Sequence, residues 1–233
     1  MTKEYLVVGG SSGIGLEVVK RLEKEGHRTV VLSRTNDKLQ GIQNVEHVSY
    51  DVASGSDFEL GLSKLDGVVY APGTINLKPF HRLKSEDFNH DFQINVLGAV
   101  HVLQKVMPLL KKGEDASVVL FSTVAVQQGM AFHASVAASK GAVEGLARSL
   151  AAEWAPTIRV NCIAPSVTDT PLAERLLSTN EKKEASGKRH ALQRVGTAED
   201  IANLTYFLLT NESGWMTGQT LGIDGGMSTL RSF

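Results

Sequence analysis

The stretch Tyr5-Leu-Val-Val-Gly-Gly-Ser-Ser-Gly-Ile-Gly15 decides the fold of this chain. Its first four residues are apolar or aromatic and predict a buried strand of a parallel sheet. A glycine-rich turn follows and opens into an amphipathic helix, predicted over residues 14–25. Gly9, Gly13 and Gly15 carry no Cβ, so the turn can be tight and a phosphate can approach its amides. The stretch therefore predicts a dinucleotide site, with an ordinary glycine-containing turn as the alternative.

Strand-like and helix-like segments alternate along all 233 residues, without a Pro/Gly/Ser-rich or charged linker between them. This alternation predicts a single α/β domain over residues 1–233, of the Rossmann-type doubly wound class, with a seven-stranded, mostly parallel sheet and helices on both faces. The expected strands are 4–8, 28–33, 45–49, 66–71, 115–121, 157–163 and 219–223. The expected helices are 14–25, 84–111, 134–155, 170–185 and 197–210. Ligands of such a sheet bind beyond the carboxyl ends of its strands.

Composition argues against several classes of function. The formal net charge is −1, so we expect no nucleic-acid partner, because nothing neutralises a run of phosphates. No apolar run approaches the ~20 residues that span a bilayer, and no signal peptide precedes the first strand. We therefore predict a cytoplasmic protein that does not associate with membranes, and we expect no metal site. The stretch 182–190 mixes basic residues with Glu184 and is predicted to form a solvated surface helix.

The second expected strand ends in Ser33-Arg34, where an adenosine ribose would lie. An acidic residue at this point would accept hydrogen bonds from the 2′-hydroxyl and repel a 2′-phosphate. Ser33 is instead a neutral donor, and Arg34 offers a guanidinium fork that suits a phosphate. We therefore predict NADP(H) as the preferred cofactor and NAD(H) as the alternative. The competing interpretation of Arg34 is an ordinary surface arginine.

These motifs resemble those of the short-chain dehydrogenase/reductase family over essentially the whole chain. The resemblance rests on the glycine loop and on the segments Ile94-Asn-Val-Leu-Gly98, Asn161-Cys-Ile-Ala-Pro165, Thr168-Asp-Thr170, Arg194-Val-Gly196, Thr217-Gly-Gln219 and Asp224-Gly-Gly226. It implies cofactor contacts from Gly9, Ser11, Ser12, Gly13, Ile14, Gly15, Ser33, Arg34, Asp51, Val52, Ala71, Pro72, Gly73, Asn95, Lys140, Pro165, Val167, Thr168 and Thr170. Three places depart from the family pattern: Val8 stands where threonine is usual, Tyr70-Ala-Pro-Gly73 keeps only the last glycine, and Ser166 stands where glycine is usual.

The catalytic centre departs from the pattern as well. The resemblance implies a Tyr-x-x-x-Lys pair, in which the phenol exchanges a proton with the substrate oxygen and the lysine lowers the pKa of the phenol. Here the lysine is Lys140, whereas the residue four positions earlier is Val136. The family's serine falls on Thr123, and its structural and catalytic asparagine falls on Asn95. Asn95, Thr123 and Lys140 are therefore the expected polar centre, without a phenol.

His133 is the best candidate for a replacement proton donor. It lies three residues before Val136, and imidazole is the side chain best suited to proton exchange near neutral pH. A loop histidine bonded to the backbone is the alternative. The other candidates are Tyr70, which is expected to fill the core, Ser135 and Ser139, which are expected at the helix entry or surface, and Lys140 itself.

The sequence thus predicts an NADP(H)-dependent oxidoreductase of the short-chain dehydrogenase/reductase type, which transfers hydride between nicotinamide and a small carbonyl or alcohol substrate. The alternative is a catalytically impaired protein that binds the cofactor as a sensor or assembly partner. The polar, helix-prone segment 171–193 is expected to act as a lid over the substrate. The small-residue helix near 139–154 and the C-terminal strand are expected to form a homodimer or homotetramer.

Overall fold

Seven parallel strands form the central sheet of the computed structural model, which describes residues 2–230. Their order is β3-β2-β1-β4-β5-β6-β9, and every neighbouring pair is parallel. All seven predicted strands are confirmed, with ends shifted by no more than two residues: β1 (Glu4–Val8), β2 (Arg28–Ser33), β3 (Val45–Ser49), β4 (Gly67–Tyr70), β5 (Ser117–Phe121), β6 (Arg159–Pro165) and β9 (Thr220–Ile223).

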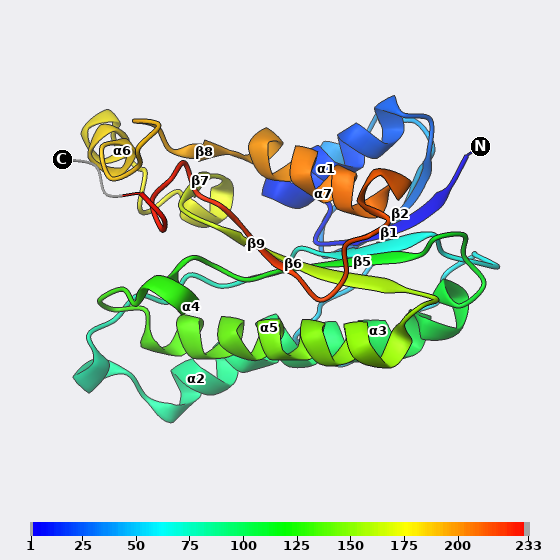
Figure 1. Cartoon of the computed structure of the whole chain (residues 1–233), viewed down its shortest axis with the longest axis horizontal. Helices are drawn as coiled ribbons and strands as arrows, with labels where there is room; N and C mark the ends of the chain where they lie inside the picture. Colours follow the sequence, from blue (N-terminus) through cyan, green and yellow to red (C-terminus); the bar gives the residue numbers. More distant parts are fainter. Residues whose placement is uncertain (1, 231–233) are drawn as a thin grey trace.

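Helices cover both faces of this sheet (Figure 1). One face carries α1 (Gly13–Lys24) and α7 (Ala198–Leu209), which pack against each other. The other face carries α2 (Ser85–Phe92), α3 (Gly98–Leu110) and α5 (Ala134–Trp154). The predicted single domain of the doubly wound class is therefore the observed architecture, and the strand order reverses beside β1, as this class requires for a ligand crevice.

Two predicted helices are wrong in their extent. The helix expected over 84–111 is interrupted by a π-helical turn at Gln93–Leu97, which divides α2 from α3. Such wide turns are frequent at functional sites, and the hydrophobic spacing cannot show them because one extra residue leaves the surrounding pattern almost unchanged. The Tyr70 hydroxyl donates to the carbonyl oxygen of Ile94 at 2.6 Å, so a side chain outside the helix supplies a hydrogen bond to the wide turn.

The helix expected over 170–185 does not begin where predicted. A short 3-10 turn spans Pro171–Ala173, and the helix α6 covers only Asn180–Gly187. Thr179 explains the later start, because its hydroxyl caps the new helix by accepting the Lys182 amide at 3.3 Å. Three small elements were not predicted at all: α4 (Ala125–Gln128) and the two-stranded parallel sheet of β7 (Thr168–Asp169) and β8 (Gly196–Thr197).

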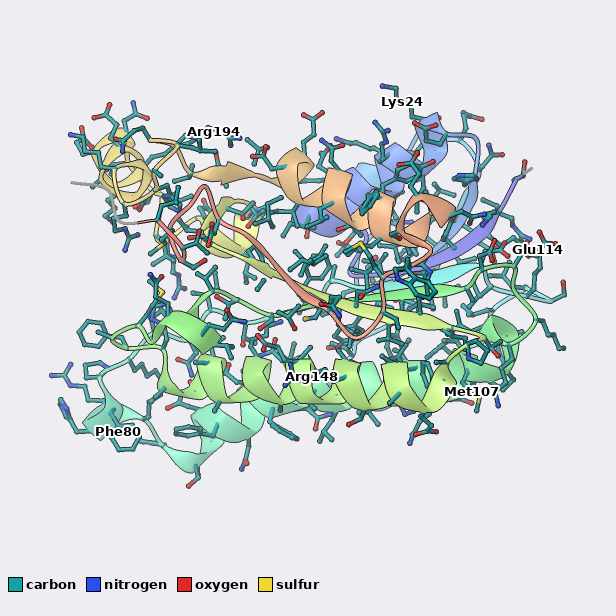
Figure 2. The ribbon with its side chains drawn as sticks, viewed as in Figure 1. Lys24, Phe80, Met107, Glu114, Arg148 and Arg194 are labelled. Carbon is teal, nitrogen blue, oxygen red and sulfur yellow. The ribbon has the colours of Figure 1, made fainter. Side chains whose placement is uncertain are left out.

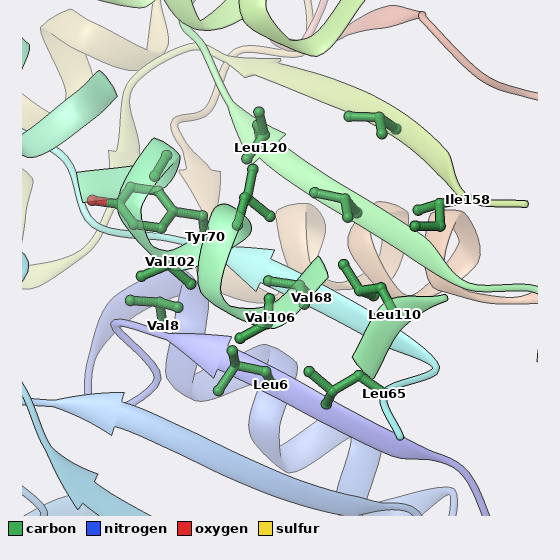
Figure 3. Packing of buried hydrophobic residues seen from close by; sticks show 14 of the residues in the cluster. Leu6, Val8, Leu65, Val68, Tyr70, Val102, Val106, Leu110, Leu120 and Ile158 are labelled. Carbon is green, nitrogen blue, oxygen red and sulfur yellow. The ribbon is translucent and has the colours of Figure 1, made fainter. Parts of the chain in front are cut away.

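The sheet and its helices enclose two apolar clusters, one on each face. Figure 3 shows the cluster under α3, where Leu6, Val68 and Leu120 of three neighbouring strands meet Val106 and Leu110. Charged side chains such as Lys24, Glu114 and Arg194 lie at the periphery (Figure 2). Close packing of this apolar interior fixes the strands relative to one another.

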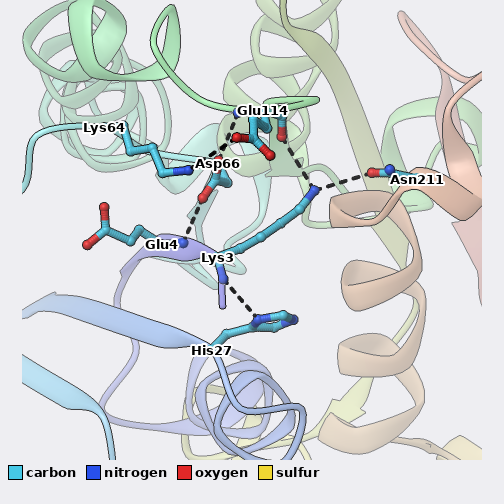
Figure 4. A network of polar contacts seen from close by, with 7 residues as sticks. All are labelled: Lys3, Glu4, His27, Lys64, Asp66, Glu114 and Asn211. Atoms are coloured by element: carbon cyan, nitrogen blue, oxygen red, sulfur yellow. Dashed lines mark hydrogen bonds and ion pairs between the residues drawn. The ribbon is translucent and has the colours of Figure 1, made fainter. Parts of the chain in front are cut away.

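A polar network closes the amino-terminal edge of the sheet (Figure 4). Asp66 is fully buried and accepts the backbone amides of Glu4 and Glu114, each at 2.8 Å. Lys3 Nζ reaches the Glu114 carbonyl oxygen at 3.4 Å and Asn211 Oδ1 at 3.3 Å. These groups serve stability, and they leave the opposite edge, at the carboxyl ends of the strands, for ligands. Among the described residues, no helix is long and apolar enough to cross a membrane.

Candidate active site

The glycine turn after β1 leaves no room for side chains. Gly9 and Gly13 have φ values of +75° and +53°, a region that favours glycine. A Cβ on Gly15 would lie 2.3 Å from the carbonyl oxygen of Gly9, so only glycine fits there. Helix α1 begins directly after the turn, has no acidic residue in its first turn, and receives no cap from the side chain of Ser12. Its first amides are therefore free to bind an anion.

A first cavity of about 560 Å³ extends from this turn toward β2. It is lined by fourteen of the residues that the sequence assigned to the cofactor: Gly9, Ser11, Ser12, Gly13, Ile14, Gly15, Ser33, Arg34, Asp51, Val52, Ala71, Pro72, Gly73 and Thr170. Sequence reasoning missed Lys38, a second cation that lines the end marked by Arg34. It lies in the 3-10 turn Asp37–Leu39 that follows β2, and its nearness in sequence to Arg34 was the available signal.

The two predicted residues at the end of β2 are arranged differently from each other. Arg34 is exposed and forms no ion pair or side-chain hydrogen bond within residues 2–230. Ser33 is buried, and its hydroxyl donates to the Thr35 carbonyl oxygen at 2.8 Å while His47 Nε2 lies 3.1 Å away. The expected donor role of Ser33 is therefore already filled within the protein, whereas the guanidinium of Arg34 is available to a ligand.

A second cavity of about 300 Å³ adjoins the first, and the two share Ile14, Ala71, Gly73, Thr170 and Leu172 in their walls. It brings together most of the residues predicted for the reacting end of the site: Thr123, His133, Lys140, Pro165, Val167 and Thr168. Leu172 and Leu176, from the segment 171–193 predicted to be a lid, also line it. The walls are otherwise mainly apolar, which suits a small organic ligand with few polar groups.

Lys140 lies in α5 and is 7% exposed. Its Nζ donates to the carbonyl oxygen of Phe121 at 2.8 Å, at the end of β5. Burial lowers the pKa of this ammonium group from 10.5 to about 8, because the charged form loses its hydration. Gly73 borders the lysine, since a Cβ there would lie 3.4 Å from Nζ, at van der Waals distance.

Asn95 lies in the π-helical turn and is buried next to the second cavity without lining it. Its amide nitrogen donates to Thr74 Oγ1 at 3.0 Å and to Ser139 Oγ at 2.9 Å. A Cβ on Gly73 would lie 3.5 Å from Asn95 Oδ1, so this oxygen and Lys140 Nζ both border the same glycine. The structure thus places Asn95 behind the polar centre, where it orders neighbouring side chains.

Comparison with known proteins identifies the family. A family model described as enoyl-(acyl carrier protein) reductase matches residues 8–228. A tropinone reductase homolog from Arabidopsis thaliana, At5g06060, is 34% identical, over 97% of this chain and 92% of its own. L-xylulose reductase from Bos taurus is 32% identical, over 96% of each chain. The solved structure of ElxO with NADP bound is 25% identical, has a TM-score of 0.88, and matches over 99% of this chain and 100% of its own.

The chain belongs to the short-chain dehydrogenase/reductase family. L-xylulose reductase is by name a reductase and the ElxO structure holds NADP, and the sheet order and the glycine turn of this chain agree with membership of the family. The resemblance inferred from the motifs is thereby confirmed at the level of the family and of its fold.

Val136 lies in the first turn of α5, at the position where the family pattern has a tyrosine. Val136 is 5% exposed and lines the second cavity together with Lys140, one helical turn later on the same face. Thr123 lines the same cavity from the loop after β5. Within the described residues its hydroxyl donates to no group and accepts only the Ala125 amide, at 3.3 Å. A hydroxyl and an ammonium group thus face a cavity that the valine closes with methyl groups.

The candidate proton donors separate clearly. His133 lines the second cavity, and its Nδ1 is bonded to the Ala131 carbonyl oxygen at 2.7 Å, as the alternative of a backbone-bonded loop histidine expects, while its role as a proton donor stays a prediction. Tyr70 lines neither cavity, because it is buried and its hydroxyl donates to the Ile94 carbonyl oxygen. Burial also raises the pKa of its phenol. Ser135 and Ser139 are buried outside both cavities, and Ser139 Oγ donates to the Val136 carbonyl oxygen at 2.9 Å.

Sequence reasoning missed a further group in the second cavity. Ser166, Arg189 and Met227 line it, and the buried ring of His190 lies behind Ser166. The expectation that 182–190 is a solvated surface helix is therefore wrong at its end, where Ser186 and His190 are buried. The serine in place of the usual glycine at position 166 was the one sequence signal that pointed to this group.

Proposed function

We propose that this protein is an NADP(H)-dependent oxidoreductase that transfers hydride between nicotinamide and a small carbonyl or alcohol substrate. Two adjoining cavities at the carboxyl ends of the strands support this proposal, because together they offer a phosphate-binding turn and a mainly apolar chamber. The cofactor, when bound, supplies or accepts the hydride. The residues of this chain must bind it, orient the substrate and manage one proton.

The residues present fit such a cofactor. The turn at Gly9 and Gly15 admits a pyrophosphate against the free amides of α1, and a Cβ on Gly15 would clash with the Gly9 carbonyl oxygen and distort that turn. Arg34 and Lys38 support the choice of NADP(H), because two cations line the end of the first cavity where a 2′-phosphate would lie. Lys140, Pro165, Val167, Thr168 and Thr170 would hold the nicotinamide half, since all five line the second cavity and Thr170 also lines the first.

The position of Val136 carries the proposal of an atypical active site. It lines the same chamber as Thr123 and Lys140 but offers no proton. General acid catalysis is typically worth roughly 10²–10⁴-fold in rate, so an enzyme without its phenol is slow or uses another donor. Thr123 can still polarise a carbonyl by donating a hydrogen bond to its oxygen, and Lys140 can still bind the cofactor ribose.

The substitution Val136→Tyr tests this function, with Val136→Phe as its matched control. Both variants add an aromatic ring to the cavity, and only the first adds a phenol. We expect NADPH-dependent reduction of small carbonyl compounds to rise at least about tenfold in Val136→Tyr relative to Val136→Phe. Equal rates for the two variants would contradict the assignment of this position to proton transfer.

Val136 also supports a second candidate function, a cofactor-binding protein without turnover that acts as a sensor or assembly partner. This hypothesis requires NADPH binding in the first cavity and no oxidation of NADPH by the wild-type protein with any carbonyl compound. Efficient turnover by the wild type would exclude it. A titration with NADPH, followed by assays of NADPH oxidation with small carbonyl compounds, therefore decides between the two functions.

The predicted assembly and location remain proposals. Strand β9 lies at one edge of the sheet, and a Cβ on Gly145 of α5 would meet nothing within 4 Å. An edge strand and an open small-residue face support the association of copies of this chain, as homodimer or homotetramer, through these elements. Sedimentation of the purified protein tests the assembly.

We keep the cytoplasm as the proposed compartment and small molecules as the proposed substrates.

A further inference from the structure

Ser166 and His190 form a hydrogen-bonded pair in the wall of the second cavity. Ser166 follows β6 directly and lines the cavity, while His190 lies in the turn after α6 and is 1% exposed. Ser166 Oγ and His190 Nε2 are 2.8 Å apart. On the other side of the ring, His190 Nδ1 lies 2.9 Å from the carbonyl oxygen of Ser186. The Ser166 hydroxyl, the His190 imidazole and the Ser186 carbonyl oxygen are therefore joined by two consecutive hydrogen bonds.

The carbonyl oxygen of Ser186 fixes the protonation pattern of the ring. A carbonyl oxygen only accepts, so Nδ1 of His190 carries a hydrogen. In the neutral ring Nε2 is then the bare nitrogen, and it accepts the hydroxyl proton of Ser166. In the charged ring Nε2 donates to Ser166 Oγ instead, and the hydroxyl proton turns to another acceptor. Met227 Sδ, 3.1 Å from Ser166 Oγ, is such an acceptor within the protein.

We propose that Ser166 is the proton donor to the substrate oxygen and that His190 resupplies it, in place of the phenol that Val136 cannot provide. This inference rests on the proposed function. When the carbonyl carbon gains a hydride, its oxygen is left with the electron pair of the broken π bond. That oxygen takes the hydroxyl proton of Ser166, and Ser166 Oγ takes the Nε2 proton of the charged His190. His190 ends neutral, with Nδ1 still bonded to Ser186. Because the ring is buried, a proton from bulk solvent returns through the Ser166 hydroxyl when the cavity is empty and restores the charged ring between turnovers.

The surroundings of His190 favour transfer through Ser166 over any other route. Gly225 packs against the ring, since a Cβ there would lie 3.3 Å from the His190 Cβ. The nearby charged groups have other partners: Arg189 Nη2 donates to Ser186 Oγ at 3.3 Å, and the Asp224 carboxylate accepts the Gly226 amide at 2.8 Å. Within residues 2–230 no charged side chain bonds to His190, and the serine hydroxyl is the one polar side chain bonded to its ring.

The pair differs from His133 in one decisive respect. His133 Nδ1 is also bonded to a backbone carbonyl oxygen, but no side chain contacts its other nitrogen within the described chain. His190 is held on both sides, and a hydroxyl stands between its ring and the cavity. Ser166 is therefore the proposed catalytic residue, and His190 is a positioning residue that acts through it.

The test uses the full chain and three variants: Ser166→Ala, His190→Gln and His101→Gln. His101 lies on α3, lines neither cavity and controls for the loss of an imidazole. Nitrogen NMR of protein labelled at histidine reads the tautomer of each ring without turnover. We expect His190 to carry its proton on Nδ1, and its Nε2 signal to move in Ser166→Ala. A ring protonated on Nε2 alone, or a signal unchanged in Ser166→Ala, would overturn the pairing.

Single-turnover reduction of a carbonyl panel with NADPH, followed across pH, tests the transfer. We expect Ser166→Ala and His190→Gln to lose roughly 10²-fold in rate with NADPH affinity kept within about twofold, whereas His101→Gln matches the wild type. One ionisation that controls the wild-type rate should vanish in His190→Gln while that of Lys140 remains, which a merely structural role would not produce. Wild-type turnover with unchanged variants overturns the relay alone. A wild type that binds NADPH and reduces nothing overturns the proposed function and the relay with it.

Discussion

Replacing Lys140 by methionine is expected to stabilise the folded protein at neutral pH. Burial lowers the pKa of this ammonium group from 10.5 to about 8. At ~1.4 kcal/mol for each tenfold change in proton affinity, keeping the group charged inside the fold at pH 7 costs about 3 kcal/mol. Methionine has a similar shape without the charge, but it loses the hydrogen bond to the Phe121 carbonyl oxygen, a cost of about 1 kcal/mol. The expected net gain in unfolding free energy is about 2 kcal/mol.

The sign of this effect depends on pH in a specific way. Between about pH 8 and 10.5 the unfolded chain still binds a proton at Lys140 that the folded chain has released. Wild-type stability therefore rises with pH through this interval, because the unfolded state binds more protons. Methionine does not titrate, so its advantage over the wild type should shrink to near zero by about pH 10.

Urea unfolding of the wild type and of Lys140→Met at pH 7 and pH 10 measures the effect. Lys112→Met is the matched control, because Lys112 is exposed just after α3 and forms no ion pair within residues 2–230. We expect the control to stay within about 0.5 kcal/mol of the wild type at both values of pH. A Lys140→Met protein less stable than the wild type at pH 7, or an advantage independent of pH, would refute the reasoning. Loss of catalysis in this more stable variant would show that the lysine is kept for function.

Three further predictions concern other sites. Gly15→Ala should lower the unfolding free energy by roughly 1–3 kcal/mol and abolish NADPH binding, because its Cβ would lie 2.3 Å from the Gly9 carbonyl oxygen. Gly61→Ala, whose Cβ meets nothing closer than 4.0 Å, should be neutral or stabilising by up to ~1 kcal/mol, and equal losses in urea melts of the two variants would contradict this. Arg34→Ala should weaken the binding of NADPH by roughly tenfold to a hundredfold and leave the binding of NADH unchanged. Equal weakening of both affinities in fluorescence titrations would contradict the assignment of Arg34 to the 2′-phosphate. Cys162, whose thiol pKa burial raises to about 12, should react with a thiol reagent at pH 8 only after unfolding, and rapid labelling of the native protein would contradict its burial.

Local patterns were sufficient to predict the sheet and most of the cleft. The apolar run before Gly9 and the spacing of the glycines depend only on neighbours in sequence, and β1, α1 and the first cavity follow from them. The interval between Val136 and Lys140 likewise places both side chains on one helix face. Each of these predictions used a period that the backbone itself imposes.

Contacts between distant segments could not be predicted in the same way. The π-helical turn at Asn95 depends on Tyr70 and Ser139, which lie in other elements. The pairing of Ser166 with His190 spans 24 positions and crosses from β6 to the turn after α6. No periodicity relates such residues, because the tertiary fold alone brings them together.

Titration of the purified wild-type protein with NADPH and with NADH, followed by fluorescence, tests the central claim most directly. The account predicts saturable binding of both, with NADPH the tighter ligand, and no binding of either to Gly15→Ala. Failure of both nucleotides to saturate the wild type at millimolar concentration would contradict the claim that the glycine turn holds a pyrophosphate.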